Sequence, residues 1–357
     1  MLYSVLMITC ETCGATFKTA QGLAGHKRLR HGAYGLADEL GATLTSKQLH
    51  RKILNRLAEK LADRLAEAIL ESHGQEILDA CLEELSHQGL YLRSLGRFQN
   101  VRAIIVAAGE SDRLLSLSSD KPACLLEIGS KTIIGRELEN LRACGIYDIA
   151  VVRGYHGDKI NYPDIRYYEN KDYRKTGILR SLFHAKDEMD DEFIFCYSDI
   201  VHTKEVLEML LQDRSDISLV VDTDWKSHYH HRYQHPVSEA ELVKVEGDRI
   251  TQIGKNVIPP DEVHGEFIGL TKFSRKGAEI LKMNYERAIQ NYKAIAFHQA
   301  PSIDKAYFTD MIQELIDQGY PVCHIDIHGG WAEIDTLEDF NRVSRELQSV
   351  LKINSHN

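Results

Sequence analysis

The sequence predicts an α/β protein with a mostly parallel sheet, helices on both of its faces and an antiparallel insertion, preceded by two smaller N-terminal parts. Three observations predict this architecture. Apolar runs of strand length alternate with helix-period patterns after Val101, residues 241–254 break that rhythm with two alternating runs around a turn, and the charge changes sign near residue 34. We therefore expect three domains, at residues 1–34, 35–98 and 99–357.

The composition is that of a folded globular protein. Of the 357 residues, 43% are hydrophobic and 27% are charged, and the net charge is −10. These values exclude a collagen-like or disordered chain and argue against a chain-wide surface for nucleic acid or anionic membranes. No apolar run approaches the roughly 18 residues that span a bilayer, and the first ten residues lack the basic flank of a signal peptide. We expect a cytoplasmic protein without a membrane partner.

The first domain, residues 1–34, holds a metal-binding pattern. Four candidate ligands follow the spacing Cys-x2-Cys-x12-His-x4-His, which lets two thiolates and two imidazoles complete one tetrahedron: Cys10, Cys13, His26 and His31. With Phe17 and Leu23 as a small apolar core, the segment resembles a single Cys-Cys-His-His zinc finger, which implies a structural Zn²⁺. One finger contacts only about three base pairs, so we expect little nucleic-acid binding from it and favour a structural or protein-contact role.

The second domain, residues 35–98, is predicted to be a helical connector. It contains no proline, and apolar side chains recur every four residues among charged ones: Leu49, Ile53, Leu57, Leu61, Leu65 and Ile69. The stripe predicts an amphipathic helix but is short for a coiled coil. The connector either packs as a helical hairpin on its own chain or, together with the finger, docks a protein partner or a second copy in a homodimer.

The third domain, residues 99–357, supplies the alternating strands and helices. Five apolar runs are typical of buried strands: residues 103–108, 146–152, 193–197, 217–221 and 322–327. Amphipathic stretches predict helices at residues 137–145, 178–188, 204–213, 310–319 and 337–348. Strand, helix and strand at this spacing give a Rossmann-like parallel sheet with right-handed crossovers. Residues 241–254 alternate around Gly247 and predict a β-hairpin inserted into that sheet.

A candidate phosphate-binding turn follows the first of these strands. Ala107 and Ala108 end the strand, Gly109 opens a loop of small residues, and Arg113 and Lys121 follow. Such a loop at the carboxyl end of a parallel strand aims backbone N–H groups at whatever lies above the sheet edge, and phosphates bind there. An ordinary strand-to-helix turn with two solvated cations has a similar sequence, so the residues that follow decide between the two interpretations.

Those residues resemble the sugar-phosphate and choline-phosphate nucleotidyltransferases of the nucleotide-diphospho-sugar transferase-like superfamily. That family begins with a strand, an Ala-Ala-Gly-x-Gly-x-Arg-Leu loop and an Asp-Lys-Pro, and the chain has matching residues at 107–109, 113–114 and 120–122. It departs at Ser111, where the family has glycine, and at Ala123, where many members have a second lysine. The resemblance covers residues 101–350 and is closest to cytidylyltransferases that activate phosphocholine and phosphonates.

The resemblance implies a role for each matching residue. Arg113 and Lys121 are implied as the catalytic cations, and Asp199 and Asp335 as the ligands of a catalytic Mg²⁺. Nucleotide contacts are implied for Ala107, Ala108, Gly109, Ser111, Arg153, Gly154 and Tyr155. Substrate contacts are implied for Asn170, Ser181 and Glu266, although Glu266 has the alternative role of pairing within the sheet edge.

An aromatic, His-rich stretch at residues 225–235 follows Asp222 and Asp224. Its plain interpretation is a solvated loop. Its functional interpretation is a lid whose Arg232 grips a phosphate or phosphonate, or whose aromatic faces receive a quaternary ammonium group.

Together these residues suit nucleotidyl transfer. A phosphate monoester has a second pKa of about 6 and is largely dianionic at neutral pH, so the site needs positive charge rather than a general base. We expect Mg²⁺-dependent transfer of a nucleoside monophosphate, CMP from CTP, onto a small phosphonate or phosphorylated alcohol, with release of pyrophosphate. Two alternatives stay open: a sugar-1-phosphate nucleotidyltransferase, and a zinc-finger nucleic-acid-binding regulator whose α/β domain senses a nucleotide without catalysis.

Overall fold

A computed structural model describes residues 8–9, 16–17, 101–230, 232–293 and 295–354, and the chain divides into two compact units, Met1–Leu95 and Gly96–Asn357. In the first unit, β1 (Ile8–Thr9) and β2 (Thr16–Phe17) pair antiparallel. They stand before and after Cys10 and Cys13 in the sequence. The predicted zinc ligands and the helical connector lie outside the described residues.

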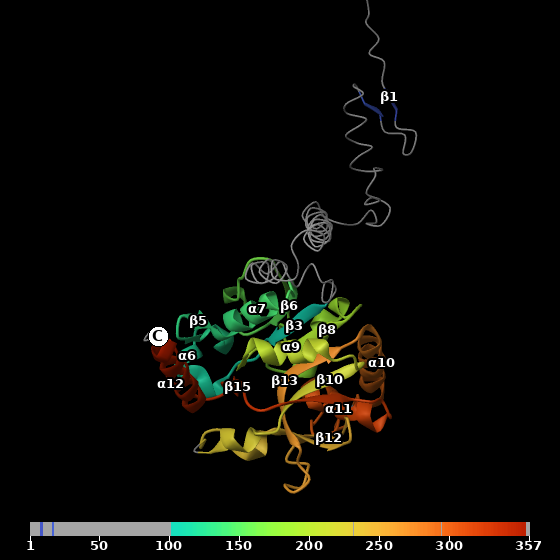
Figure 1. Ribbon diagram of the computed structural model, residues 1–357. Helices are drawn as coiled ribbons and strands as arrows, with labels where there is room; N and C mark the ends of the chain where they lie inside the picture. The colour runs from blue at the N-terminus through green and yellow to red at the C-terminus, as the bar shows by residue number, and fades with distance from the viewer. Residues whose placement is uncertain (1–7, 10–15, 18–100, 231, 294, 355–357) are drawn as a thin grey trace, which may run out of the picture. The chain divides into compact units, whose positions relative to one another are not determined.

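The second unit is built on a nine-stranded sheet, coloured from teal at β3 to red-orange at β14 (Figure 1). In hydrogen-bonded order the strands are β10 (Ile217–Asp222), β14 (Cys323–Ile327), β12 (Arg249–Lys255), β11 (Glu241–Glu246), β13 (Gly265–Phe273), β8 (Phe193–Tyr197), β3 (Arg102–Ala107), β6 (Asp148–Arg153) and β7 (Ile165–Glu169). The five predicted strands and the predicted hairpin are all present. The sequence did not predict β7 or β13.

The prediction of a mostly parallel sheet was wrong, because the sheet is mixed. β8, β3, β6 and β7 run parallel, as do β10 and β14, but β13 runs antiparallel to β8, β10 and β11. All nine residues of β13 are buried, but Glu266, Lys272 and two glycines interrupt its apolar run and hide the strand in the sequence. Because β10 pairs with both β13 and β14, the strands β13, β10, β14, β12 and β11 close into a ring.

Helices cover both faces of the sheet, as predicted. Successive side chains of a strand point to opposite faces. Accordingly Ile105 of β3 packs in a core with α7 (Ile133–Ala143) and α9 (Lys204–Gln212), whereas Ile104 packs in a second core with α8 (Ile178–Leu182), α10 (Arg275–Asn291) and α11 (Phe308–Asp317). The remaining helices are α6 (Leu115–Ser118) and α12 (Leu337–Asn354). Within the described ranges, no helix has the length and apolar character needed to cross a membrane.

A two-stranded sheet brings residues 331–335 to the end of β8, a central strand of the nine-stranded sheet. β15 (Trp331–Glu333) pairs antiparallel with β9 (Ile200–His202), so that Glu333 lies opposite Ile200. The next backbone contact in this register is a hydrogen bond of 2.8 Å from the Ile334 N–H to the Asp199 carbonyl. β4 (Glu127–Ile128) and β5 (Lys131–Thr132) form a second small hairpin. The β9–β15 pairing therefore sets residues 333–335 beside the end of β8.

Candidate active site

The loop after β3 lines a cavity of about 140 Å³ at the carboxyl edge of the parallel strands. Of the residues predicted to contact nucleotide or substrate, this cavity contains Ala107, Gly109, Ser111 and Ser181, and Asp199 forms part of its wall. Gly109 has open space on the side where a Cβ would stand. The site thus leaves the backbone of this loop accessible to an anion, as a phosphate-binding turn requires.

A second cavity, of about 220 Å³, adjoins the first and shares Ile178 and Asp199 with it. Its acidic wall consists of Asp199, Glu239, Glu241, Glu266, Glu333 and Asp335. Its aromatic wall consists of Tyr197, Phe267, Tyr307 and Trp331. Among the described residues that line it, Lys255 is the one cation, so the second cavity is strongly acidic, whereas Asp199 is the one charged residue among the described residues that line the first.

Asp199 stands at the junction of the two cavities, where a cation would compensate its charge. Its Oδ1 atom is buried and has no hydrogen-bond partner. Burial raises the pKa of Asp199 well above its usual range, and the charges of Asp335 and Glu333 raise it further. The predicted metal ligands Asp199 and Asp335 both line the second cavity, and carboxylate oxygens such as theirs suit Mg²⁺.

Arg113 lies at the acidic end of this arrangement. One guanidinium nitrogen is 2.7 Å from Oδ2 of Asp335, and the other is 3.0 Å from Oε2 of Glu239. Burial alone would raise the pKa of Asp335, but the neighbouring His235 imidazole and the charge of Arg113 lower it instead. Lys121, the other predicted cation, is half-buried, and no hydrogen bond or ion pair of its ammonium group occurs within the described part of the chain.

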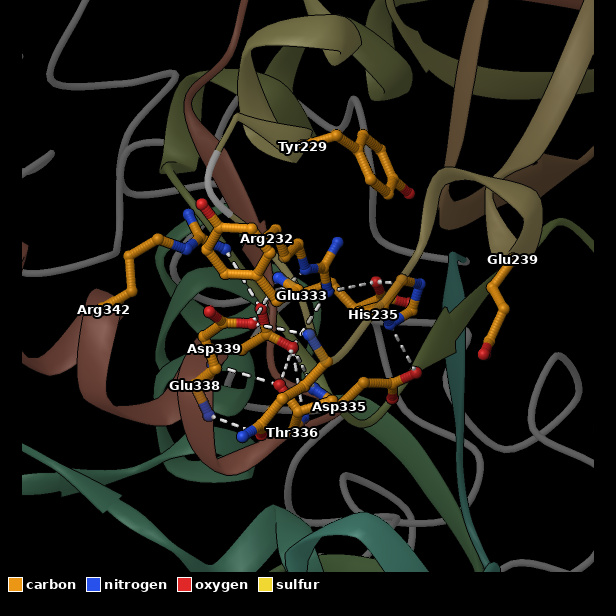
Figure 2. A network of polar contacts seen from close by, with 12 residues as sticks. Tyr229, Arg232, His235, Glu239, Glu333, Asp335, Thr336, Glu338, Asp339 and Arg342 are labelled. Carbon is orange, nitrogen blue, oxygen red and sulfur yellow. Dashed lines mark hydrogen bonds and ion pairs between the residues drawn. The ribbon is translucent and has the colours of Figure 1, made fainter.

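Two further residues of the acidic cluster were missed as candidate ligands in the sequence. Figure 2 shows His235 and Glu333 beside Asp335, and one ligand atom of each lies within 4.8 Å of the others. The imidazole of His235 is 3.3 Å from Asp335 and 3.5 Å from Glu333. Residues two apart in an extended segment share a side, so the spacing of Glu333 and Asp335 was the signal that could have found Glu333. His235 carries no comparable signal.

Arg232 is not free to grip a substrate, contrary to the functional interpretation of residues 225–235. Its guanidinium is buried and makes two bonds of 2.6 and 3.0 Å to Asp339 and one of 2.9 Å to Glu333 (Figure 2). The next two backbone N–H groups, of Tyr233 and Gln234, donate to Glu338. The stretch does expose residues to solvent, as the plain interpretation expects, but these contacts also fasten it to the first turn of α12.

Glu266 lines the second cavity as a buried side chain. The hydroxyl of Tyr229 donates to its Oε1, while its Oε2 has no hydrogen-bond partner. Burial raises the pKa of Glu266 well above its usual range, and the charge of Glu333 adds to this effect. Beside it, Trp331 is fixed by its indole N–H, which donates to the buried Asp222 over 2.8 Å. The cavity wall therefore includes an acidic group with one carboxylate oxygen that has no hydrogen-bond partner.

The remaining predicted residues build the loops around the first cavity. A Cβ on Gly154 would lie 2.6 Å from the carbonyl oxygen of Ala108, so this position admits only glycine without a shift. The Tyr155 hydroxyl donates to the Ser119 carbonyl over 2.8 Å, just before Lys121. Buried Asn170 donates to Ser181 over 2.8 Å.

Arg153 has partners of its own outside this cavity. Its guanidinium donates to the Ile160 carbonyl over 2.8 Å and forms an ion pair with Glu169. It also lies over the ring of Tyr167, 4.2 Å from the centroid. The side chain thus braces the loop after β6 and is absent from the residues that line either cavity.

The comparisons with known proteins agree with this geometry. The model of the MobA-like NTP transferase domain matches residues 103–252. A CTP:phosphoglutamine cytidylyltransferase of Campylobacter jejuni is 32% identical over 250 residues, which cover 67% of this chain and 97% of that protein. Among solved structures, the CTP:phosphocholine cytidylyltransferase of Streptococcus pneumoniae has a TM-score of 0.54 at 21% identity, covering 69% of this chain and 99% of the other.

A second solved structure, the inositol-1-phosphate CTP transferase from T. maritima, has a TM-score of 0.55 at 20% identity and covers 68% of this chain and 94% of its own. These two structures share the fold, and the Campylobacter relative shares sequence over nearly its whole length. With the glycine turn, the two adjoining cavities and Asp199 at their junction, the chain contains a MobA-like NTP transferase domain and belongs to the nucleotidyltransferases of the nucleotide-diphospho-sugar transferase superfamily.

Proposed function

We propose that the enzyme transfers CMP from CTP onto a small phosphorylated or phosphonate acceptor and releases pyrophosphate, in a reaction that depends on Mg²⁺. The observation that carries the proposal is the position of Asp199, which belongs to two adjoining cavities of different character. The first cavity has the glycine turn that suits phosphates, and the second has room for a small acceptor. A group at their junction lies where the two substrates meet.

The nucleotide is assigned to the first cavity. Backbone N–H groups of the loop at Gly109 and Ser111 would hold its phosphates, and Lys121 would approach them as a mobile positive charge. Arg113 is paired with Asp335 in the protein without substrates, and we infer that phosphate oxygens replace Asp335 as its partner. This exchange would place positive charge on the triphosphate and release a carboxylate for the metal ion.

The transfer itself needs little covalent chemistry from the protein. An oxygen of the acceptor phosphate or phosphonate forms a bond to the α-phosphorus of CTP, while the bond from that phosphorus to the bridging oxygen of the β-phosphate breaks and pyrophosphate leaves. The acceptor is already largely dianionic at neutral pH, so its oxygen attacks without losing a proton to the protein. The residues of the site therefore act by positioning both anions and by offsetting their repulsion.

Asp199 and Asp335 are the proposed ligands of Mg²⁺, with Glu333 close enough to take part. The buried Oδ1 of Asp199 has no hydrogen-bond partner, and its pKa is raised by burial and by its acidic neighbours; both features fit a bound cation. When bound, Mg²⁺ would neutralise negative charge on the phosphates. Arg232 contacts Glu333, and His235 contacts both Glu333 and Asp335. These contacts hold the two carboxylates in place.

The preference for CTP is supported by the Campylobacter relative, whose name describes a CTP-dependent enzyme acting on phosphoglutamine. For the acceptor, the second cavity offers both carboxylates and aromatic rings. Glu241 and Glu266 line it together with the aromatic residues. We propose that Glu266 contacts the acceptor, and that Asn170 and Ser181 order the loop between the two cavities.

Pyrophosphate release measured with each of CTP, UTP, ATP and GTP tests this assignment. Each nucleotide is paired with phosphocholine, 2-aminoethylphosphonate, phosphoglutamine or glucose 1-phosphate, and the Asp335→Asn variant serves as the inactive control. Turnover with CTP and a non-sugar acceptor is expected. Turnover confined to glucose 1-phosphate would overturn the proposal in favour of a sugar-1-phosphate nucleotidyltransferase, and tight DNA binding without any turnover would favour a regulator.

We also propose that Cys10, Cys13, His26 and His31 hold a structural Zn²⁺ and that this unit, with residues 35–98, contacts a protein partner or a second copy of the chain. The spacing of the four residues supports the metal. The antiparallel pair β1 and β2, before and after the two cysteines in the sequence, suits a finger hairpin. Zinc content of the Cys10→Ser/Cys13→Ser variant, lower by one ion per chain than that of the parent, is the expected result.

A further inference from the structure

Two imidazoles meet one carboxylate at a place that neither cavity of the active site includes. His264, His324 and Asp326 each offer one ligand atom, and these atoms all lie within 4.8 Å of one another. The three side chains are partly exposed, with 28%, 10% and 37% of their surfaces accessible, so an ion from solvent can reach them. None of them lines the cavities that hold Asp199.

The fold brings these side chains together from β14 and from the residue that precedes β13. His324 and Asp326 are two residues apart on β14 and so share one of its faces. His264 directly precedes β13, and its backbone N–H donates to the Val243 carbonyl of β11 over 2.9 Å, which fixes the start of β13. Nε2 of His264 is 2.9 and 3.0 Å from the two oxygens of Asp326, and Nδ1 of His324 is 2.7 Å from the nearer one.

The hydrogen bonds available to His324 indicate that the cluster of His264, His324 and Asp326 lacks a positive charge. A neutral imidazole carries one N–H, yet both ring nitrogens of His324 face oxygen atoms: Nδ1 faces Asp326, and Nε2 faces the Gly247 carbonyl at 3.3 Å. If Nε2 donates to Gly247, the lone pair of Nδ1 points at a carboxylate. A positive charge must then lie between them, either as additional protons on the two rings or as a metal ion.

We propose that His264, His324 and Asp326 bind one divalent transition-metal ion, with Zn²⁺ as the preferred metal and water completing its coordination. Two imidazoles and a carboxylate are a ligand set that suits Zn²⁺, whereas Mg²⁺ prefers oxygen ligands alone. The Gly247 carbonyl supplies the outer contact that commonly orients a metal-bound histidine, because it holds the proton on Nε2 and leaves Nδ1 free to bind.

The role of this ion is structural. The pairing of β12 with β14 consists of a single residue pair, Arg249 and Cys323, so the ring of five strands closes weakly there. The ion joins β14 to the start of β13, and the Gly247 contact adds the turn between β11 and β12. β13 carries Glu266, and β14 leads to Trp331, so the ion would brace two walls of the acceptor cavity.

Metal binding by the full chain tests the proposal, and the N-terminal cysteines must first be removed as competing ligands. In a Cys10→Ser/Cys13→Ser background with excess Mg²⁺, Co²⁺ is titrated by its visible absorption, and bound Zn²⁺ is counted by mass spectrometry. The expected result is one Zn²⁺ per chain, its loss in the His264→Ala/His324→Ala variant, and an affinity for Co²⁺ at least about tenfold weaker in Asp326→Asn. His328→Ala, a histidine on the loop after β14, is the matched control and should leave binding unchanged.

Circular dichroism and thermal unfolding in EDTA separate loss of metal from loss of fold. The variants are expected to be folded in EDTA, and Zn²⁺ should raise the unfolding temperature of the Cys10→Ser/Cys13→Ser parent but not that of the double histidine variant. If the folded Cys10→Ser/Cys13→Ser parent bound no Zn²⁺, or if the double histidine variant bound as much as that parent, the cluster would not be a metal site and the proposal would be wrong. Neither readout depends on nucleotidyl transfer, so this result is independent of the proposed function.

Discussion

At the scale of single residues, Asp199 is a buried carboxylate in an unfavourable electrostatic environment. It is buried beside Asp335 and Glu333, and no hydrogen bond reaches its Oδ1. An arrangement of this kind destabilises a protein without substrates and is retained where a ligand compensates it. The proposed ligand is Mg²⁺. Asp199 should therefore lower the stability of the metal-free protein and be required for catalysis.

We predict that Asp199→Asn lowers kcat for CMP transfer by at least about 100-fold while making the protein more stable in EDTA. The pKa of Asp199 is higher in the folded protein than in the unfolded chain, so the folded state holds this proton more tightly. Stability is therefore greatest below the ordinary pKa of an aspartate and is lost as the pH rises through the raised one. In EDTA, the unfolding temperature of the parent should fall over that interval, and that of the variant should fall less.

Asp190→Asn is the matched control, because Asp190 lies on the surface with Lys282 as its partner. It should leave both activity and the pH profile unchanged. If Asp199→Asn instead had parental turnover, or were less stable than the parent in EDTA near neutral pH, Asp199 would be a structural carboxylate rather than a metal ligand.

Replacing Lys121 should impair catalysis without changing stability, since its ammonium group has no described partner to lose. We predict that Lys121→Ala lowers kcat/KM for CTP by about 100-fold and changes the free energy of unfolding by less than about 0.5 kcal/mol. Steady-state kinetics and urea unfolding provide the two measurements. Lys131→Ala, which removes an exposed lysine paired with Glu139, is the control for a generic loss of charge. Unchanged kinetics of Lys121→Ala would remove this residue from the catalytic set.

At the scale of elements, the stretch at residues 225–235 acts as a fastener between the ring of strands and α12. Its Arg232 is almost fully buried and serves two carboxylates, Asp339 at the start of α12 and Glu333 in the active site. Removing one partner of a buried ion pair leaves an uncompensated charge, which typically costs about 3–5 kcal/mol. We predict a loss of that size in Arg232→Ala, measured as the free energy of unfolding in urea.

Arg342→Ala is the control for this loss, since Arg342 approaches the same Asp339 from 3.6 Å and is more exposed. Its cost should stay below about 1 kcal/mol. Turnover by the residual folded Arg232→Ala should also fall, because Glu333 loses the group that orients it. An Arg232→Ala protein that unfolds like the parent but no longer binds the acceptor would restore the interpretation of Arg232 as a substrate ligand.

How much the sequence could predict depends on whether the signal is local. The buried strands β3, β6, β8, β10 and β14 are short apolar runs, and periodicity found each of them. β13 was missed because polar residues and glycines interrupt its apolar run: Glu266 faces the cavity, and Gly269 avoids the ring of Tyr197, which a Cβ would approach to 2.4 Å. A function-bearing strand thus departs from the pattern that identifies ordinary strands.

The same distinction holds for the site. Asp199 and Asp335 could be named from motifs next to strands, and pairing of β9 with β15 sets the backbone of residues 333–335 beside Asp199. The partners of Arg232 could not, because the contacts to Asp339 span 107 residues and nothing near Arg232 in the sequence indicates them. A cationic side chain in a polar, aromatic stretch is compatible both with a substrate and with a distant carboxylate, and only the tertiary structure decides between these.

At the scale of the whole molecule, the described residues of the candidate site all belong to the second unit, Gly96–Asn357. The predicted and observed residues of the site run from Ala107 to Asp335, and the described hydrophobic cores are made of residues from 101 onward. The first unit, Met1–Leu95, contributes no described residue to either cavity. Catalysis by the second unit should therefore be separable from any partner binding by the proposed zinc finger.

We predict that a chain beginning at Gly96 transfers CMP with a kcat within about twofold of the parent, because positioning and charge compensation both come from the second unit. Pyrophosphate release at saturating CTP and acceptor measures this, and the same truncation carrying Asp199→Asn shows that the activity is its own. Gel filtration of both lengths tests whether the first unit also mediates self-association. A truncated protein with an intact circular dichroism spectrum but more than tenfold lower kcat would show that the first unit takes part in catalysis, and the separation argued here would fail.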